Sequence, residues 1–303
     1  MTVPRPASPV LDALLARVVD YAGLFPPARL SMEDAVRAFA DYRGGPDAWM
    51  LGRFVVPASR LEEFETAGRE LLPASASSSW ALSVLLSADV ELDVRSIQRF
   101  NDRHRDARQG AVHVDTVEFK ATRVEDIYAA DEFIGGFDAF IEVPVGEDPG
   151  PLVSAVADVG AKAKIRTGGV TANAIPGARH VLRFVRHCLD CGVAFKATAG
   201  LHHPLRAEYP LTYEPDAPRG VLFGYLNVFL ATAFVRHGMD DSEALDLLEE
   251  RDASAFQVDG DRVRWREHEL TAEQLRAARH EVVAFGSCSF REPVDELRAL
   301  GLR

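Results

Sequence analysis

The sequence lacks any apolar run long enough to cross a membrane. Its longest apolar stretch, residues 220–235, falls short of the roughly 20 residues that a spanning helix needs, and predicts a buried helix instead. Cysteine is scarce, with 3 in 303 residues, which excludes a disulfide framework and favours a reducing compartment. No basic segment followed by an apolar one marks a secretory leader. We therefore expect a cytoplasmic protein without membrane association.

Positive charge is also in short supply. The net charge is −12, which argues against non-specific nucleic-acid binding, because that binding relies on a basic face. An anionic ligand would have to be held by a local cluster of cations. With 47% hydrophobic and 26% charged residues, the composition is that of a globular protein and is compatible with a homo-oligomer. We expect its partner to be a small-molecule substrate.

Short apolar runs alternate with stretches of helical spacing along the first two thirds of the chain. This alternation is typical of consecutive βαβ units on a parallel sheet. Six units in a row favour a closed (β/α)8, TIM-like barrel over an open sheet. The expected strands cover residues 50–58, 80–88, 112–121, 139–145, 161–169 and 193–200.

The first and last strands of the barrel are less obvious. Residues 20–25 are candidates for the first strand, and residues 283–290 for the eighth. We expect one domain over residues 1–303, with 205–303 as an irregular C-terminal elaboration. That region predicts a Pro-rich loop, the apolar helix, an acidic helix, a hairpin turning at Asp259–Gly260 and two further helices.

Charged side chains recur on one face of four successive strands, near their carboxyl ends. Strand side chains alternate between two faces, and in a barrel the apolar face meets the helices, so this charged face points inward, towards the mouth where barrel active sites lie. The inward set comprises Glu118 and Lys120, Glu142, Lys164 and Arg166, and Lys196 and Thr198.

Such a cluster is compatible with two roles. Inward charges can form a structural ion network that closes the barrel. Alternatively, a lysine whose pKa is lowered by a neighbouring cation attacks a carbonyl and forms a Schiff base. Lys164 and Lys196 are the candidate amines, and Glu118, Glu142 or Asp115 would move protons as a C–C bond is made or broken.

The same cations also suit an anionic substrate. Arg166 and the lysines can bind a carboxylate or phosphate. Backbone N–H groups of Gly168, Gly169 and Gly200, in the loops after two of these strands, would add hydrogen bonds. We therefore expect a substrate that is small, carbonyl-bearing and anionic.

The order of these segments resembles a known family. The runs "HVDTVEF", "FIEVPVGE", "AKIRTGG" and "AFKATAGL", within residues 110–202, are similar to strands four to seven of class I aldolases of the deoxyribose-phosphate aldolase type. The resemblance implies that Lys164 is the Schiff-base lysine, Lys196 its pKa-lowering partner, and Asp115 or Glu118 the proton relay.

The resemblance has limits that bear on the substrate. Arg166 stands where that family has a small hydroxyl residue, and no Gly/Ser phosphate loop follows the eighth strand, so a phosphate substrate is not implied. The segments "DYAGLFPPA", "FKATAGLHHP" and "FGSCSF" also resemble signature segments of a bacterial (β/α)8-barrel family.

Two alternatives of other classes stay open. His202 and His203 follow the Lys196 strand, beside the expected mouth, where they would contact the substrate. Alternatively, with Glu142 and His113, they would give a divalent-metal site and a metal-dependent hydrolase or lyase. A non-catalytic barrel that binds a small anion or a protein partner is the other. The main hypothesis, an aldolase or related lyase, needs no cofactor.

Three further residues have less certain roles. Asp20 approaches the mouth if residues 20–25 form the first strand. Cys288 does so if its segment returns there, although a packed cysteine is the more ordinary role. Asn227 lies inside the apolar helix, and a buried amide needs partners, so we expect it to tie the helix to the Pro-rich loop.

Overall fold

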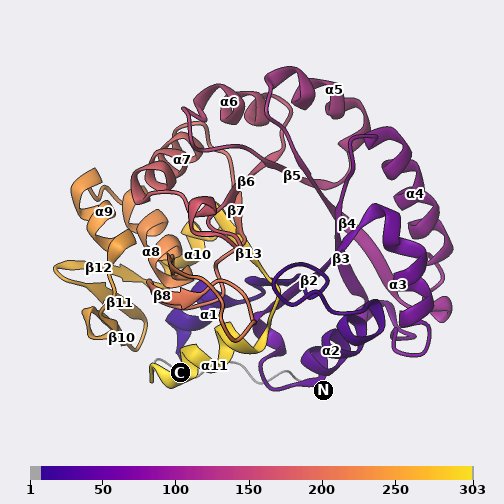
Figure 1. The fold of residues 1–303 in the computed structure, drawn as a ribbon, viewed down its shortest axis with the longest axis horizontal. Helices are drawn as coiled ribbons and strands as arrows, with labels where there is room; N and C mark the ends of the chain where they lie inside the picture. The colour runs from indigo at the N-terminus through magenta and orange to yellow at the C-terminus, as the bar shows by residue number, and fades with distance from the viewer. Residues whose placement is uncertain (1–7, 302–303) are drawn as a thin grey trace.

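Eight parallel strands close into a barrel in the computed structural model, which describes residues 8–301 (Figure 1). The order around the barrel is β1-β13-β7-β6-β5-β4-β3-β2. This confirms the predicted (β/α)8 class, including both doubtful strands, since β1 pairs with β13 and closes the ring. The strands are β1 (Val19–Tyr21), β2 (Leu51–Pro57), β3 (Trp80–Leu85), β4 (Val112–Lys120), β5 (Asp138–Glu142), β6 (Lys162–Arg166), β7 (Phe195–Thr198) and β13 (Val282–Ser287).

Helices surround most of the barrel's outer face (Figure 1). Outward strand residues pack against them, as where the Phe195 ring of β7 meets that of Phe184 at 5.2 Å between centroids. The helices pair apolar inner faces with polar outer ones, the pattern of a helix lying on a sheet. They are α2 (Met32–Gly44), α3 (Leu61–Gly68), α4 (Val90–Arg103), α5 (Val124–Ile134), α6 (Gly150–Asp158) and α7 (Ala178–Asp190).

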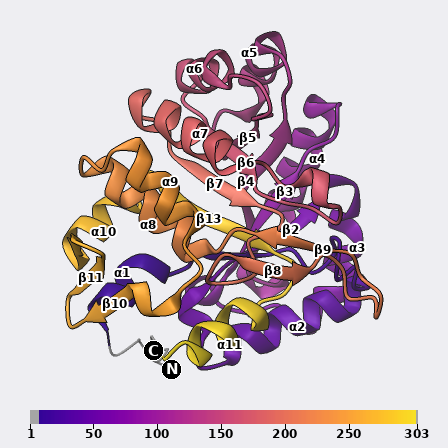
Figure 2. The same cartoon turned by 60° about the vertical axis from the view of Figure 1, so that its left-hand side comes forward.

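The C-terminal elaboration is largely an insertion between β7 and β13. In Figures 1 and 2 the β8–β9 hairpin lies close to α11, which follows β13. At the other end of the chain, α1 (Pro9–Leu15) packs on α10. The added elements are β8 (Ala207–Pro210), β9 (Arg219–Leu222), α8 (Tyr225–Arg236), α9 (Asp241–Glu249), β10 (Phe256–Asp259), β11 (Arg262–Trp265), β12 (His268–Thr271), α10 (Ala272–Ala278) and α11 (Arg291–Ala299).

Two sequence predictions for this region need correction. The Pro-rich segment is more than a loop, because β8 pairs with β9 as an antiparallel hairpin. The start of the apolar stretch 220–235 therefore belongs to a strand, and the helix begins only at Tyr225. The hairpin at Asp259–Gly260 is confirmed, and β12 adds a third strand that the sequence did not reveal.

Helix α8 is buried on nearly all sides, as a helix that is apolar all round must be. Asn227 within it has partners for its whole amide. Its Oδ1 accepts from the Arg206 N–H at 2.9 Å, and its Nδ2 donates to the carbonyls of Leu247 and Glu250 at 2.8 and 2.9 Å. The expected tie to the Pro-rich segment is therefore present. Over the described range, no helix combines the length and hydropathy that crossing a membrane requires.

Candidate active site

Lys164 and Lys196 lie side by side inside the barrel. They are register partners on the neighbouring strands β6 and β7, so their side chains leave the sheet at the same level and on the same face. Their relative exposures are 5% and 1%. The alternation predicted from the sequence is therefore correct for this pair. Two buried ammonium groups at one level require counter-charges, because an unpaired buried charge is very costly.

Glu118 of β4 supplies the central counter-charge. Its Oε2 accepts from Lys164 Nζ at 2.9 Å, and its Oε1 accepts from Lys196 Nζ at 2.7 Å. The Ser83 hydroxyl, on β3, donates to the same Oε1 at 2.5 Å. One carboxylate, 2% exposed, thus connects both amines.

Each lysine also has a carboxylate of its own. Lys196 Nζ donates to Asp20 Oδ2 at 2.5 Å, and Lys164 Nζ lies 3.1 Å from Glu142 Oε2. The other oxygen of Asp20, Oδ1, accepts from the backbone N–H of Arg53 on β2 at 2.9 Å. The absence of a side chain at Gly52 makes room for it, since a Cβ there would lie 2.4 Å from Oδ1. Ser83 was not among the predicted site residues, and Asp20 was expected near the mouth only if its segment formed the first strand. Asp20 belongs to a strand of only three residues, too short for a periodic signal.

The network fixes the charge of its members. Burial disfavours the ionised form of Glu118, but Lys164 and Lys196 outweigh this and hold its pKa well below the usual range. Burial alone would raise the pKa of Glu142, but Lys164 and Arg166 outweigh burial and lower it. For Lys196, burial lowers the pKa less than Asp20 and Glu118 raise it. Lys196 is therefore a protonated lysine at neutral pH.

A pocket of about 330 Å³ opens onto this network. It lies at the carboxyl ends of the strands, where barrel active sites occur. Glu118, Lys164 and Lys196 contribute to its lining, so the network borders the open space of the pocket. The pocket also has an apolar part of its lining, here called the apolar wall, which comprises Phe25, Pro26, Pro27, Val170, Leu211 and Leu222.

The side of the pocket next to the lysines suits an anion. Arg166 lines it with a half-exposed guanidinium, whose contacts to Glu142 are long, at 3.3 and 3.4 Å. Thr198, Gly169 and Gly200 line it too, and across the described residues no group accepts a hydrogen bond from the backbone N–H of either glycine. Arg166, Gly169 and Gly200, which the sequence analysis named for anion binding, therefore all line the pocket.

Gly168 does not line the pocket, but it allows the loop after β6 to pack closely against the loop after β7. A Cβ on Gly200 would lie 3.0 Å from Gly168 Cα, and the φ of Gly200 is +79°. The preceding Ala199 also has a positive φ, 56°. Thr167 Oγ1 holds this turn by donating to the Ala199 carbonyl at 2.8 Å. Gly168 therefore shapes the pocket without lining it.

Two predicted residues lie apart from the lysine network. Asp115 pairs with the Arg53 guanidinium at 2.7 and 2.9 Å and contacts neither Lys164 nor Lys196. The physical reason is an irregularity in β4, where the register with β3 skips Asp115, as in a β-bulge. Lys120, the last residue of β4, is exposed and does not line the pocket. The carboxylate between the lysines is that of Glu118.

His202 and His203 line the mouth of the pocket, and both bind glutamates of α11. His202 Nδ1 is 2.9 Å from Glu292 Oε2, and His203 Nδ1 is 2.8 Å from Glu296 Oε1. Cys288, just after β13, lies beside His202, with its Sγ 3.6 Å from Nδ1. The sequence could not indicate the two glutamates, because they are some 90 positions away along the chain.

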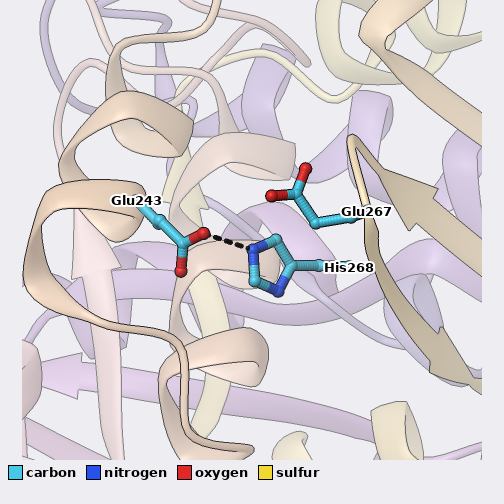
Figure 3. A group of neighbouring side chains, drawn as sticks. All are labelled: Glu243, Glu267 and His268. Carbon is cyan, nitrogen blue, oxygen red and sulfur yellow. Dashed lines mark hydrogen bonds and ion pairs between the residues drawn. The ribbon is translucent and has the colours of Figure 1, made fainter.

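The structure does not bring together the groups of the metal alternative. His113 hydrogen-bonds Ser79 Oγ at 2.9 Å near the start of β4, away from the mouth. The cluster with metal-ligand spacing that the described residues do contain is Glu243, Glu267 and His268 (Figure 3). In it, His268 Nε2 already hydrogen-bonds Glu243 at 2.9 Å. This cluster belongs to α9, β12 and the turn before β12, and does not line the pocket.

The sequence matches no family model and no curated protein. Solved structures that resemble the chain include an aldolase, QR15, at 12% identity and a TM-score of 0.44, covering 95% of this chain and 97% of that chain. Another is lysine/ornithine decarboxylase from Vibrio vulnificus, complexed with cadaverine, at 12% identity and a TM-score of 0.39, covering 80% of this chain and 55% of that chain. At such low identities and TM-scores, neither similarity indicates which reaction this protein catalyses.

Proposed function

We propose that this protein is a class I, Schiff-base aldolase or related lyase that acts on a small anionic carbonyl compound. The observation that carries the proposal is the sharing of Glu118 by Lys164 and Lys196 at the floor of an open pocket. A buried amine that must exchange its proton, next to a fixed cation and ionised carboxylates, is the equipment of amine catalysis.

The different environments of the two lysines suggest different roles. Lys196 is the fixed cation, because two carboxylates hold it at 1% exposure and raise its pKa. Lys164 is the nucleophile. It passes a proton to a carboxylate, and its nitrogen then bonds to the substrate carbonyl carbon as water leaves. The resulting iminium accepts the electron pair of the neighbouring C–C bond when that bond breaks.

The remaining groups serve proton transfer and binding. Glu118 and Glu142 are held ionised beside Lys164, and either can accept the hydroxyl proton released as the C–C bond breaks. Arg166 and the N–H groups of Gly169 and Gly200 bind the anionic end of the substrate. The apolar wall excludes water, which would hydrolyse the iminium early.

Borohydride trapping tests this assignment. The protein is incubated with pyruvate or acetaldehyde, reduced, digested and mapped by mass. We expect a reduced adduct on Lys164, and none in the Lys164→Met variant. An adduct on Lys196 would exchange the two roles, and an adduct on neither lysine with any carbonyl of a broad panel would overturn the proposal.

Lys162→Met is the matched control. Lys162 is on the same strand, two residues earlier, and pairs with Asp138 at 2.9 Å without lining the pocket. It therefore tests whether loss of any inward lysine of β6 abolishes trapping. We expect this variant to form the Lys164 adduct at the wild-type rate.

A further inference from the structure

Cys288, His202 and Glu292 form a connected arrangement at the mouth of the pocket that the lysine mechanism does not use. Cys288 Sγ lies 3.6 Å from His202 Nδ1 and 3.8 Å from Nε2, and Glu292 Oε2 lies 2.9 Å from Nδ1. All three residues line the pocket. A sulfur, an imidazole in contact with it and a carboxylate that orients the imidazole are the parts of an activated thiol nucleophile.

We propose that Cys288, His202 and Glu292 form a second nucleophilic site, which transfers the acyl group of a small ester or thioester to the Cys288 sulfur. The proposal does not depend on the Schiff-base function, since it uses different atoms. Glu292 is the positioning residue: it holds the His202 ring from the first turn of α11.

Burial and charge support an active thiol here. Cys288 is 4% exposed and His202 8% exposed. Burial lowers the pKa of His202, but its hydrogen bonds with Cys288 and Glu292 outweigh this and raise the pKa to about 10. His202 is thus an imidazolium at neutral pH, and it lies in contact with the Cys288 sulfur. The Tyr213 Oη lies 3.5 Å from the same sulfur.

The chemistry balances without an added oxidant or reductant. The thiolate attacks the acyl carbon, an S–C bond forms, the C–O or C–S bond to the leaving group breaks, and His202 protonates that group. Water then attacks the thioester, His202 accepts its proton, and the acid leaves as the thiolate re-forms. Leu211, Leu222 and Val170 line the same pocket and offer an apolar surface for the acyl chain.

The test uses p-nitrophenyl acetate and the full-length protein. We expect a burst of p-nitrophenolate and an acetyl group that maps to Cys288 and is released by hydroxylamine, as a thioester is. Cys288→Ser should abolish the burst. His202→Asn should slow it about 10²-fold, within the usual contribution of general acid–base catalysis. An acetyl group found only on lysine, as a hydroxylamine-stable amide, or on no residue, would overturn the proposal.

Cys191 provides the matched control within the chain. It is exposed at the end of α7, and Cys191→Ser should leave the burst unchanged. In the wild-type protein, iodoacetamide should modify the buried Cys288 faster than the exposed Cys191, and this measurement needs no variant to fold. Faster modification of Cys191 would contradict an activated Cys288. The acetyl and borohydride readouts lie on different peptides, so either proposal can fail alone.

Discussion

Lys164 and Lys196 donate to opposite oxygens of a single carboxylate, that of Glu118, at 2.9 and 2.7 Å. Both amines therefore contact the same carboxylate, and both line the pocket. Asp20 and Glu118 raise the pKa of Lys196, while Lys164 pairs with Glu118 and Glu142.

Loss of the central carboxylate should destabilise the fold. Glu118→Gln leaves two buried ammonium groups with one carboxylate each, and breaking a buried ion pair costs about 3–5 kcal/mol. Urea unfolding measures the change. Glu125→Gln, at an exposed ion pair on α5, is the control and should change the free energy of unfolding by less than about 0.5 kcal/mol. Equal stability of the two variants would show that the network contributes nothing.

Acidification should remove the same stabilisation. The folded-state pKa values of Glu118 and Glu142 are depressed, so their contribution is present above the unfolded value of about 4.3 and is lost as pH falls through the folded values. Thermal melts from pH 7 downward should show Tm falling below about pH 4.3. Glu118→Gln should show a shallower fall. Identical pH profiles for variant and wild type would exclude Glu118 as a source of the acid lability.

The close approach of the loops after β6 and β7 predicts that Gly200 tolerates a side chain less well than an unhindered glycine does. Gly200→Ala adds a Cβ 3.0 Å from Gly168 Cα at a positive φ. Gly192→Ala also adds a Cβ at a positive φ, +65°, but with no atom within 4 Å. The Gly192 variant should lose only the conformational term, about 1–2 kcal/mol. The Gly200 variant should lose more and should also trap carbonyl compounds more slowly, because the pocket wall moves.

The part of the site that lies on regular strands could be predicted from the sequence. On β6 and β7, unbroken alternation placed Lys164 and Lys196 correctly on the inner face, and register then brought them together. Asp115 was not in the inward set that alternation gave, and it entered the prediction as a further carboxylate and through the family resemblance. The structure pairs it with Arg53, at the point where the register of β4 with β3 skips it. Alternation predicts which face of the sheet a residue takes only while the strand is regular, because one extra residue in a bulge moves the residues after it to the opposite face.

Contacts between distant segments were beyond prediction from local pattern. Asp20 meets Lys196 across 176 positions of the chain, and Glu292 meets His202 across 90. Both contacts depend on closure of the barrel and on the return of α11 to its mouth. Their physical cause is the tertiary fold, so periodicity within one strand contains no trace of them.

We expect Arg166 to bind the anionic group of the substrate. Its guanidinium is half exposed at the pocket and holds Glu142 only at 3.3 and 3.4 Å, which leaves hydrogen-bonding capacity for an anion. Arg166→Met should therefore weaken trapping of pyruvate about 10- to 100-fold, the value of one charged hydrogen bond. Trapping of neutral acetaldehyde should change far less, because it has no anionic group to lose.

The comparison of two carbonyl compounds separates binding from chemistry. If Arg166→Met slowed pyruvate and acetaldehyde equally, the arginine would act on Lys164 through Glu142 and would not contact the substrate anion. Arg179→Met, at an exposed position on α7, loses the same charge away from the pocket and should leave both rates unchanged. A selective loss for pyruvate in the Arg166 variant alone would locate anion recognition at the carboxyl end of β6, two residues after Lys164.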